Sequence, residues 1–190
     1  LDAGFALHPE ALLAALTPAV KLVFLCSPNN PTGGIVPLAV IERLASALAD
    51  RSLLIVDEAY IEFAGTTTAA SLLYRHPNLG VLRTLSKAWA LAGARIGTLL
   101  ASAGIVALLR RIMPPYPLPT PCVAAALAAL DADGESVMRR RVATVISERE
   151  RIAQALRLLP DVRAVLPSRA NFLCVRLADA AATYRALAGQ

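Results

Sequence analysis

The chain has 190 residues, of which 56% are hydrophobic and 17% are charged, and its formal net charge is +5. This is enough apolar material for one substantial core, in one large domain or one and a half. The basic residues are scattered rather than interleaved with stacking aromatic side chains, which argues against a nucleic-acid-binding surface, so we expect no nucleic-acid partner.

Three cysteines, Cys26, Cys122 and Cys174, lie far apart without CxxC spacing, which indicates reduced thiols in a cytoplasmic protein. The N-terminal residues do not have the basic-then-apolar order of a signal peptide. The longest charge-free apolar stretch, residues 96–109, is bounded by Arg95 and Arg110 and is too short to cross a bilayer, so we expect no membrane partner.

The first part of the chain alternates between strand and helix patterns. The opening LDAGFALHPEALLAAL predicts a loop and then a helix with Pro9 in its first turn. Residues 37–48 have helical spacing, and the apolar runs at 21–26, 52–56, 79–85 and 95–101 predict buried strands. Buried strands separated by helices or long loops predict an α/β fold with a mainly parallel sheet.

The pattern changes at a proline-rich segment, PPYPLPTP, which has five prolines in residues 114–121. No helix or central strand is expected to continue through it. Helices are predicted at 122–130 and 135–159, and strands at 163–166 and 171–177. We therefore divide the chain into residues 1–115 and the beginning of a small α+β unit, residues 116–190. Both ends lie in mid-pattern, so we expect a piece of a larger protein.

Polar residues follow the first three predicted strands, at the carboxyl ends where open parallel sheets bind ligands. The three segments are SPNNPTGG, DEAYIEF and TLSKAWALAGARIG, and the side chains of interest are Asn30, Asp57, Tyr60, Ser86, Lys87 and Arg95. Seventeen of the 19 basic residues are arginine, and only Lys21 and Lys87 are lysine. A desolvated lysine, unlike arginine, can lose its proton and act as a nucleophile.

Each of these residues also has an ordinary structural explanation when it is taken alone. Turn chemistry explains Asn30, a place in the core explains Tyr60, and a surface or helix-end charge explains Lys87 or Arg95.

Two residue pairs allow other chemistry. Asp57 and Glu58 allow a metal pair, but neither histidine of the chain falls in a ligand pattern with them. Ser86 and Lys87 allow a serine–lysine dyad, but S-x-x-K spacing is absent and adjacent residues on an emerging strand point apart.

The combined pattern is more specific than any of its members. Asn30 precedes Asp57 by 27 residues, Asp57 precedes Lys87 by 30, and Lys87 precedes Arg95 by 8. This order and spacing, over residues 1–177, resembles the fold-type I aminotransferases that depend on pyridoxal 5'-phosphate. Within them the chain is most similar to the histidinol-phosphate aminotransferases. The resemblance implies that the parallel sheet belongs to the large, cofactor-binding domain of that fold.

The resemblance implies a role for each residue. Lys87 would form a Schiff base with the cofactor aldehyde and later move a substrate proton, and Asp57 would keep the pyridine nitrogen protonated. Asn30 and Tyr60 would hydrogen-bond the ring oxygen. Ser86 and Arg95 would bind the phosphate, with Thr84 near the same end.

The tail matches the family less closely. Asn171 and Phe172 in SRANFLCVRL resemble a small-domain strand that faces the substrate. Pro117 stands where relatives often have asparagine.

The family resemblance also implies an activity. The expected reaction exchanges an amino group between L-histidinol phosphate and 2-oxoglutarate in histidine biosynthesis, in a cytoplasmic homodimer. A glycine-containing phosphate loop, an N-terminal arm, a tyrosine that crosses the dimer and a carboxylate-binding arginine of the family all fall outside these residues. We therefore expect the chain alone to be inactive. A decarboxylase of a phosphorylated amino acid, another amino-acid aminotransferase and a non-catalytic relative remain as alternatives.

Overall fold

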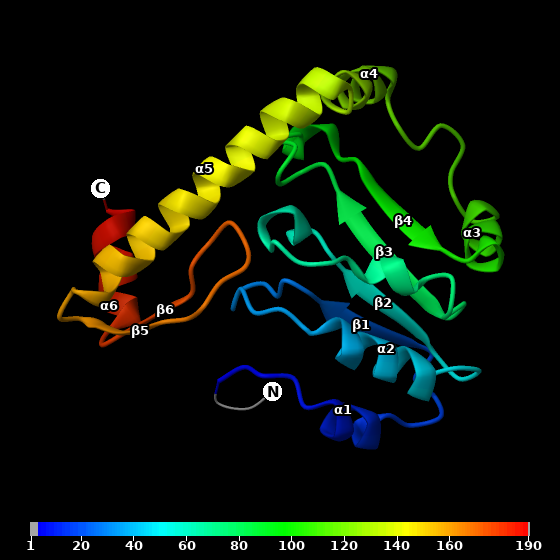
Figure 1. The fold of residues 1–190 in the computed structure, drawn as a ribbon, viewed down its shortest axis with the longest axis horizontal. Coiled ribbons are helices and arrows are strands. Elements are labelled where there is room, and N and C mark those ends of the chain that lie inside the picture. Colours follow the sequence, from blue (N-terminus) through cyan, green and yellow to red (C-terminus); the bar gives the residue numbers. More distant parts are fainter. Residues whose placement is uncertain (1–3, 190) are drawn as a thin grey trace.

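The computed structural model describes residues 4–189 and contains two sheets connected by a long helix (Figure 1). In chain order the elements are α1 (Pro9–Ala15), β1 (Leu22–Cys26), α2 (Leu38–Ala47), β2 (Leu53–Asp57), the 3-10 helices η1 (Ile61–Phe63) and η2 (Ala69–Leu72), β3 (Leu79–Thr84), η3 (Ala92–Ala94), β4 (Gly97–Ala101), α3 (Ala103–Arg110), α4 (Thr120–Ala129), α5 (Ala132–Arg157), β5 (Val162–Val165), β6 (Val175–Leu177) and α6 (Ala180–Ala188). Among these residues, no helix has both the length and the apolar character that crossing a membrane requires.

The larger sheet has the strand order β1-β2-β3-β4. β1, β2 and β3 are parallel, whereas β4 is antiparallel to β3. Cys26 is opposite Asp57 in the register of β1 and β2, and Asp57 is opposite Leu82 of β3. The predicted α/β class with a mainly parallel sheet is confirmed, and the carboxyl ends of three neighbouring strands meet at one edge.

One face of this sheet is packed and the other is partly open. Val23 and Leu25 of β1 are buried beneath α1, α2 and η2, because alternate side chains of a strand point to opposite faces. α2 contributes Ile41, Leu44 and Ala45 to the same core, with the i, i+3, i+4 spacing of an amphipathic helix. Phe24, on the opposite face, is 66% exposed.

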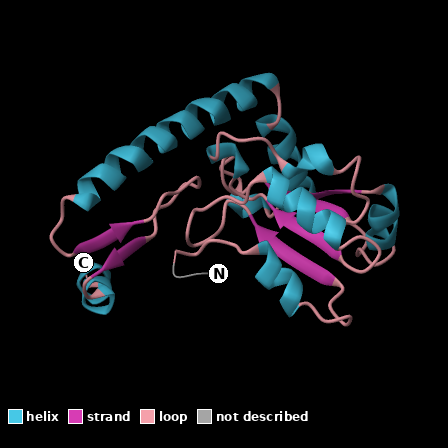
Figure 2. Ribbon diagram, turned by 60° about the horizontal axis from the view of Figure 1, so that its bottom comes forward, coloured by secondary structure: helices cyan, strands magenta, loops and turns pink. Residues whose placement is uncertain are grey.

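The second part of the chain leaves the sheet along α5 (Figure 2). Asp131 caps this 26-residue helix by accepting a hydrogen bond from Gly134 N, 2.7 Å away. Val142 of α5 packs against a cluster that includes Tyr60 and Phe63, from the η1 segment, and Ala170. The segment beyond β5 therefore returns to the edge of the larger sheet where β2 ends.

Two predictions about elements are wrong in part. Of the predicted strand at 171–177, only Val175–Leu177 is strand. The preceding residues are held elsewhere: Arg149 donates to Ala170 O at 2.8 Å, and the Phe172 ring packs on Tyr60. α4 begins at Thr120, inside the proline-rich segment, because Pro121 lies in the first turn, where a missing N–H removes no helical bond. The division at residue 115 stays a prediction.

Candidate functional site

An open cavity of ≈ 530 Å³ lies at the carboxyl ends of β2 and β3. Three separate segments bring polar groups to it: the end of β2, the turn after β3 and the start of β4. Its lining includes four of the six residues singled out from the sequence, together with Thr84: Asp57, Ser86, Lys87 and Arg95. These five residues supply one carboxylate, one amine, two hydroxyls and one guanidinium, and Arg83 and Thr98 also line the cavity.

The two hydroxyls are arranged by the end of β3. The Thr84 hydroxyl donates to the Ser86 hydroxyl at 2.9 Å and accepts from Ser86 N at 3.1 Å. β3 ends at Thr84, so Ser86 and Lys87 lie in a bend beyond the strand. Both side chains line the same cavity there, whereas adjacent residues within a strand would point apart.

Arg95 is held by an unusual backbone conformation. It follows η3 with φ 54° and ψ 40°, in the left-handed region that non-glycine residues seldom adopt. Its guanidinium donates to Ala92 O at 3.2 Å and is exposed at the cavity. Such a conformation persists only where its surroundings enforce it, and it is concentrated at functional positions.

Asn30 and Tyr60 lie on another side of Lys87 and do not line this cavity. Asn30 Nδ2 donates to the Tyr60 hydroxyl at 3.0 Å. Lys87 Nζ lies 5.3 Å from the centre of the Tyr60 ring, within the range of a cation–π contact. The Phe172 ring meets Tyr60 edge to face, with centroids 5.1 Å apart. Tyr60 therefore connects Asn30 and Phe172 to the lysine.

Lys87 also borders a second cavity, of ≈ 550 Å³, between the turn after β3 and α5. Asn171 lines this second cavity, as do Arg140 and Arg141 of α5. The family resemblance implies that Asn171 faces the substrate side, and in the structure Asn171 and Lys87 line one cavity.

Asp57 and Glu58 point to opposite faces of the sheet. Asp57 lines the cavity of Lys87, and its Oδ1 accepts from Ala59 N at 3.0 Å. Glu58 is 2% exposed and is bound by donors on the η2 side. The two carboxylates therefore do not form a metal pair, and among residues 4–189 no group of three or more histidine, cysteine, aspartate or glutamate side chains is placed to hold a metal ion.

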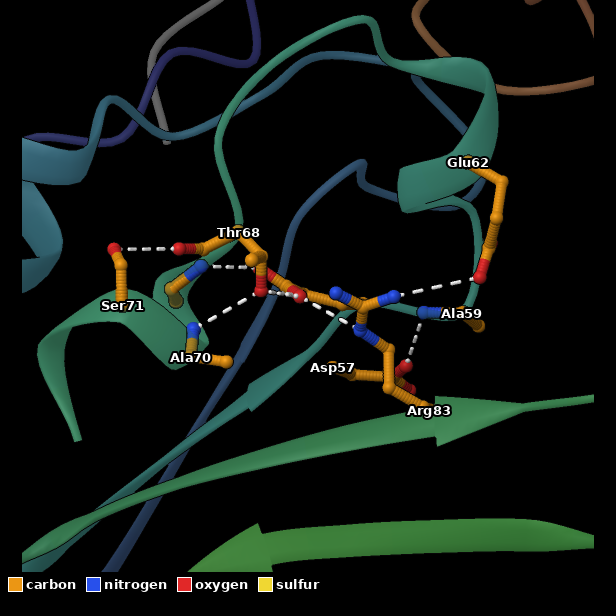
Figure 3. A network of polar contacts seen from close by, with 9 residues as sticks. Asp57, Ala59, Glu62, Thr68, Ala70, Ser71 and Arg83 are labelled. Carbon is orange, nitrogen blue, oxygen red and sulfur yellow. Dashed lines mark hydrogen bonds and ion pairs between the residues drawn. The ribbon is translucent and has the colours of Figure 1, made fainter.

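Sequence reasoning missed a polar network beside the end of β2, in which Figure 3 shows Thr68, Arg83 and Glu62. The acceptor at its centre is Glu58. It accepts from the Thr68 hydroxyl and from Ala69 N, each at 2.6 Å, and from Arg83 Nε at 2.9 Å. Arg83 Nη1 also reaches Glu62 at 3.4 Å. A signal was present: Glu58 follows Leu54 and Val56, and Arg83 follows Leu79 and Val81, each with the two-residue period of a strand face.

Two ionisable groups near the site, the Glu62 carboxyl and the Cys26 thiol, have a raised pKa. Burial raises the pKa of Glu62, and the attraction of Arg83 offsets this only in part. Burial also raises the pKa of the Cys26 thiol, and the charge of Asp57, its partner in the register, acts in the same direction.

Residues 2–190 match the family model described as aminotransferase class I and II. A histidinol-phosphate aminotransferase of Xanthomonas axonopodis pv. citri is 55% identical over 179 residues, which cover 94% of this chain and 49% of that protein. One of Xylella fastidiosa is 52% identical, with the same coverage.

A solved structure has the same fold. The histidinol-phosphate aminotransferase of Sinorhizobium meliloti, crystallised in complex with pyridoxal-5'-phosphate, superposes with a TM-score of 0.82 at 34% identity, over 95% of this chain and 49% of that one. The chain thus spans about half the length of the curated relatives that it matches.

Proposed function

We propose that this chain, which belongs to the class I and II aminotransferases, carries the lysine and much of the cofactor pocket of a histidinol-phosphate aminotransferase. The whole protein would exchange an amino group between L-histidinol phosphate and 2-oxoglutarate with pyridoxal 5'-phosphate as cofactor. The observation that carries this proposal is one cavity that joins Asp57, Lys87 and Arg95 from three separate segments.

The chemistry of the cavity fits a phosphorylated pyridine aldehyde. When bound, pyridoxal phosphate supplies an electron sink for the carbon that loses its proton. A guanidinium and two hydroxyls, from Arg95, Ser86 and Thr84, suit a phosphate dianion. A carboxylate raises the pKa of a pyridine nitrogen beside it, which is the role that we assign to Asp57.

The remaining roles fall to residues around the lysine. Lys87 would bind the cofactor covalently and, once substrate has displaced its amine, would move the proton at the reacting carbon. Asn30 and Tyr60, already joined by a hydrogen bond, would contact the ring oxygen, and the Tyr60 ring would help to orient the amine. Asn171 and Phe172 would close the substrate side.

The decisive experiment compares the two lysines of the chain. Whole protein is mixed with pyridoxal phosphate, and the visible absorption band of the lysine-bound cofactor is recorded for the wild type, Lys87→Ala and Lys21→Ala. We expect a band in the wild type and in Lys21→Ala and none in Lys87→Ala. Absence of the band from the wild type would refute the proposal that the protein binds pyridoxal phosphate. A band in Lys87→Ala would refute the proposal that Lys87 is the residue that binds it.

The substrates are tested separately. Wild-type protein supplied with histidinol phosphate and 2-oxoglutarate is expected to form glutamate, and Lys87→Ala is expected to form none. Release of carbon dioxide from a phosphorylated amino acid, without glutamate, would instead identify a decarboxylase. The homodimer and the cytoplasmic location stay predictions, and light scattering of the purified whole protein tests the first of them.

A further inference from the structure

Glu58 has no place in the chemistry above, yet it is among the few buried charged side chains of residues 4–189. A buried carboxylate is costly unless it is paired and hydrogen-bonded. Both conditions are met: Arg83 lies 2.9 Å away, and two further donors occupy its oxygens. Such a complete set of contacts gives Glu58 a single orientation.

Two of the three donors of Glu58 belong to a packed part of the molecule. Ala69 is fully buried and Leu72 nearly so, and both belong to the core formed by the larger sheet and α2. Thr68 caps η2 by accepting from Ala70 N at 3.0 Å. The η2 contacts of Glu58 are therefore made with a packed element, which holds a partner more accurately than a mobile loop does.

The backbone next to Glu58 carries two residues of the proposed site. Asp57 immediately precedes it, and Tyr60 follows two residues later. Glu58 N donates to Leu82 O at 3.0 Å, and Ile61 N donates to Glu58 O at 3.2 Å. Both backbone polar groups of Glu58 are therefore hydrogen-bonded where the chain turns from β2 into η1. Fixing the Glu58 side chain on one face of the sheet fixes the direction in which Asp57 leaves the other face.

We propose that Glu58 is a positioning residue: its contacts with Thr68, Ala69 and Arg83 hold the turn of residues 57–60 so that Asp57 and Tyr60 are presented to Lys87 and its cofactor. This inference rests on the proposed function, because it assigns the purpose of the network to that site. Glu58 itself touches neither cofactor nor substrate.

The test uses the whole protein and three substitutions at two positions of the network. Glu58→Gln keeps the shape of the side chain but loses its charge toward Arg83. Thr68→Val removes the hydrogen bond to Glu58 and also the cap of η2, whereas Thr68→Ser keeps both. Glu148→Gln is the control, because Glu148 forms an ion pair on the exposed surface of α5, away from the network.

Three quantities are measured for each variant: the dissociation constant for pyridoxal phosphate, the pH midpoint of the visible band of the bound cofactor, and the melting temperature. We expect Glu58→Gln to weaken cofactor binding about tenfold and to move the midpoint, because misplaced partners lose much of their effect. Thr68→Val is expected to act in the same direction more weakly. Thr68→Ser and Glu148→Gln are expected to match the wild type.

The pH midpoint separates positioning from simple stabilisation. The midpoint depends on the hydrogen bonds of Asp57 and Tyr60 to the cofactor, and a loss of stability alone does not move it. Lower melting temperatures, with unchanged midpoints and dissociation constants within about twofold of the wild type, would overturn the inference. If Glu58→Gln does not fold, the inference is decided by comparing the pH midpoints and dissociation constants of Thr68→Val and Thr68→Ser. A wild type that binds no cofactor refutes the proposed function and the role of Glu58 together. A wild type that binds the cofactor, with variants that match it in midpoint and dissociation constant, refutes only the role of Glu58.

Discussion

Cys26 and Asp57 lie side by side in the register of β1 and β2, at the edge of the sheet that forms the proposed site. Burial raises the pKa of the Cys26 thiol, and the charge of Asp57 raises it further. The thiolate is the reactive form of cysteine, so a raised pKa lowers its reactivity near neutral pH.

We predict that Cys26 is alkylated only at unusually high pH. In the chain with Cys122→Ser and Cys174→Ser, the pH midpoint of iodoacetamide reaction is expected to lie above that of an unstructured cysteine peptide. Asp57→Asn is expected to lower the midpoint without restoring the peptide value, because burial is the larger cause. Unfolding in urea is expected to restore it. A folded chain with the midpoint of the peptide would contradict the prediction.

Single residues also show why Asp57 and Glu58, adjacent in sequence, have different chemistry. The sequence indicated their types and their position after a strand, and strand alternation separates their directions. Which acid faces the lysine and which faces the core depends on what packs on each face. η2 and Arg83 supply donors on one side only.

Among the elements, two loops far apart in the sequence meet at Gly33. Arg169 N donates to Gly33 O at 2.8 Å. Gly33 has φ +78°, and a Cβ there would lie 2.4 Å from Ser168 Oγ and 2.8 Å from Ser168 Cα. Only glycine combines this backbone conformation with so close an approach. The contact connects the loop that carries Asn30 with the segment that carries Phe172.

We predict that Gly33→Ala destabilises the chain by about 2–5 kcal/mol, the sum of a left-handed alanine and a steric clash. Urea unfolding measures the change. Adding Ser168→Gly should recover part of the loss, since it relieves contacts with the Ser168 side chain but not the backbone strain.

Gly34→Ala provides the matched control, because the nearest neighbour of a Cβ at Gly34 would be Thr32 Oγ1, 4.0 Å away. Equal losses for the two glycines would show that the approach of Ser168 is not the cause.

Most elements were predictable within a few residues because their apolar periodicity is strong. The strands at 21–26 and 52–56 and the helix at 37–48 correspond to β1, β2 and α2. The predicted strand at 171–177 was too long because one of its apolar residues makes a tertiary contact instead of a strand contact. Phe172 packs on Tyr60, more than 100 residues earlier in the chain. Local periodicity contains no information about such a partner.

For the molecule as a whole, the face of the larger sheet that carries Asp57 is only partly covered. Leu22 and Phe24 on this face are 52% and 66% exposed. Mainly parallel sheets are normally covered on both faces. The chain also spans about half the length of its curated relatives.

We predict that the 190-residue chain alone does not turn over histidinol phosphate with 2-oxoglutarate. The physical reason is that the cavity is open and one face of the sheet is only partly covered, in a chain that spans about half the length of its curated relatives. Glutamate formation is measured for the chain and for the whole protein at equal concentration. Turnover by the chain at a rate comparable to that of the whole protein would contradict the prediction.

The sequence by itself determined the α/β class, the strand and helix patterns and the identity of the candidate groups, because periodicity and spacing are local properties of the chain. Only the tertiary structure decided which of those groups meet. It joined Asp57, Ser86, Lys87 and Arg95 in one cavity, placed Asn30 and Tyr60 on another side of the lysine, and enclosed Glu58 in a network with Arg83. The physical reason is that the register of neighbouring strands and the packing on each sheet face arise from contacts between distant residues, which no single segment specifies.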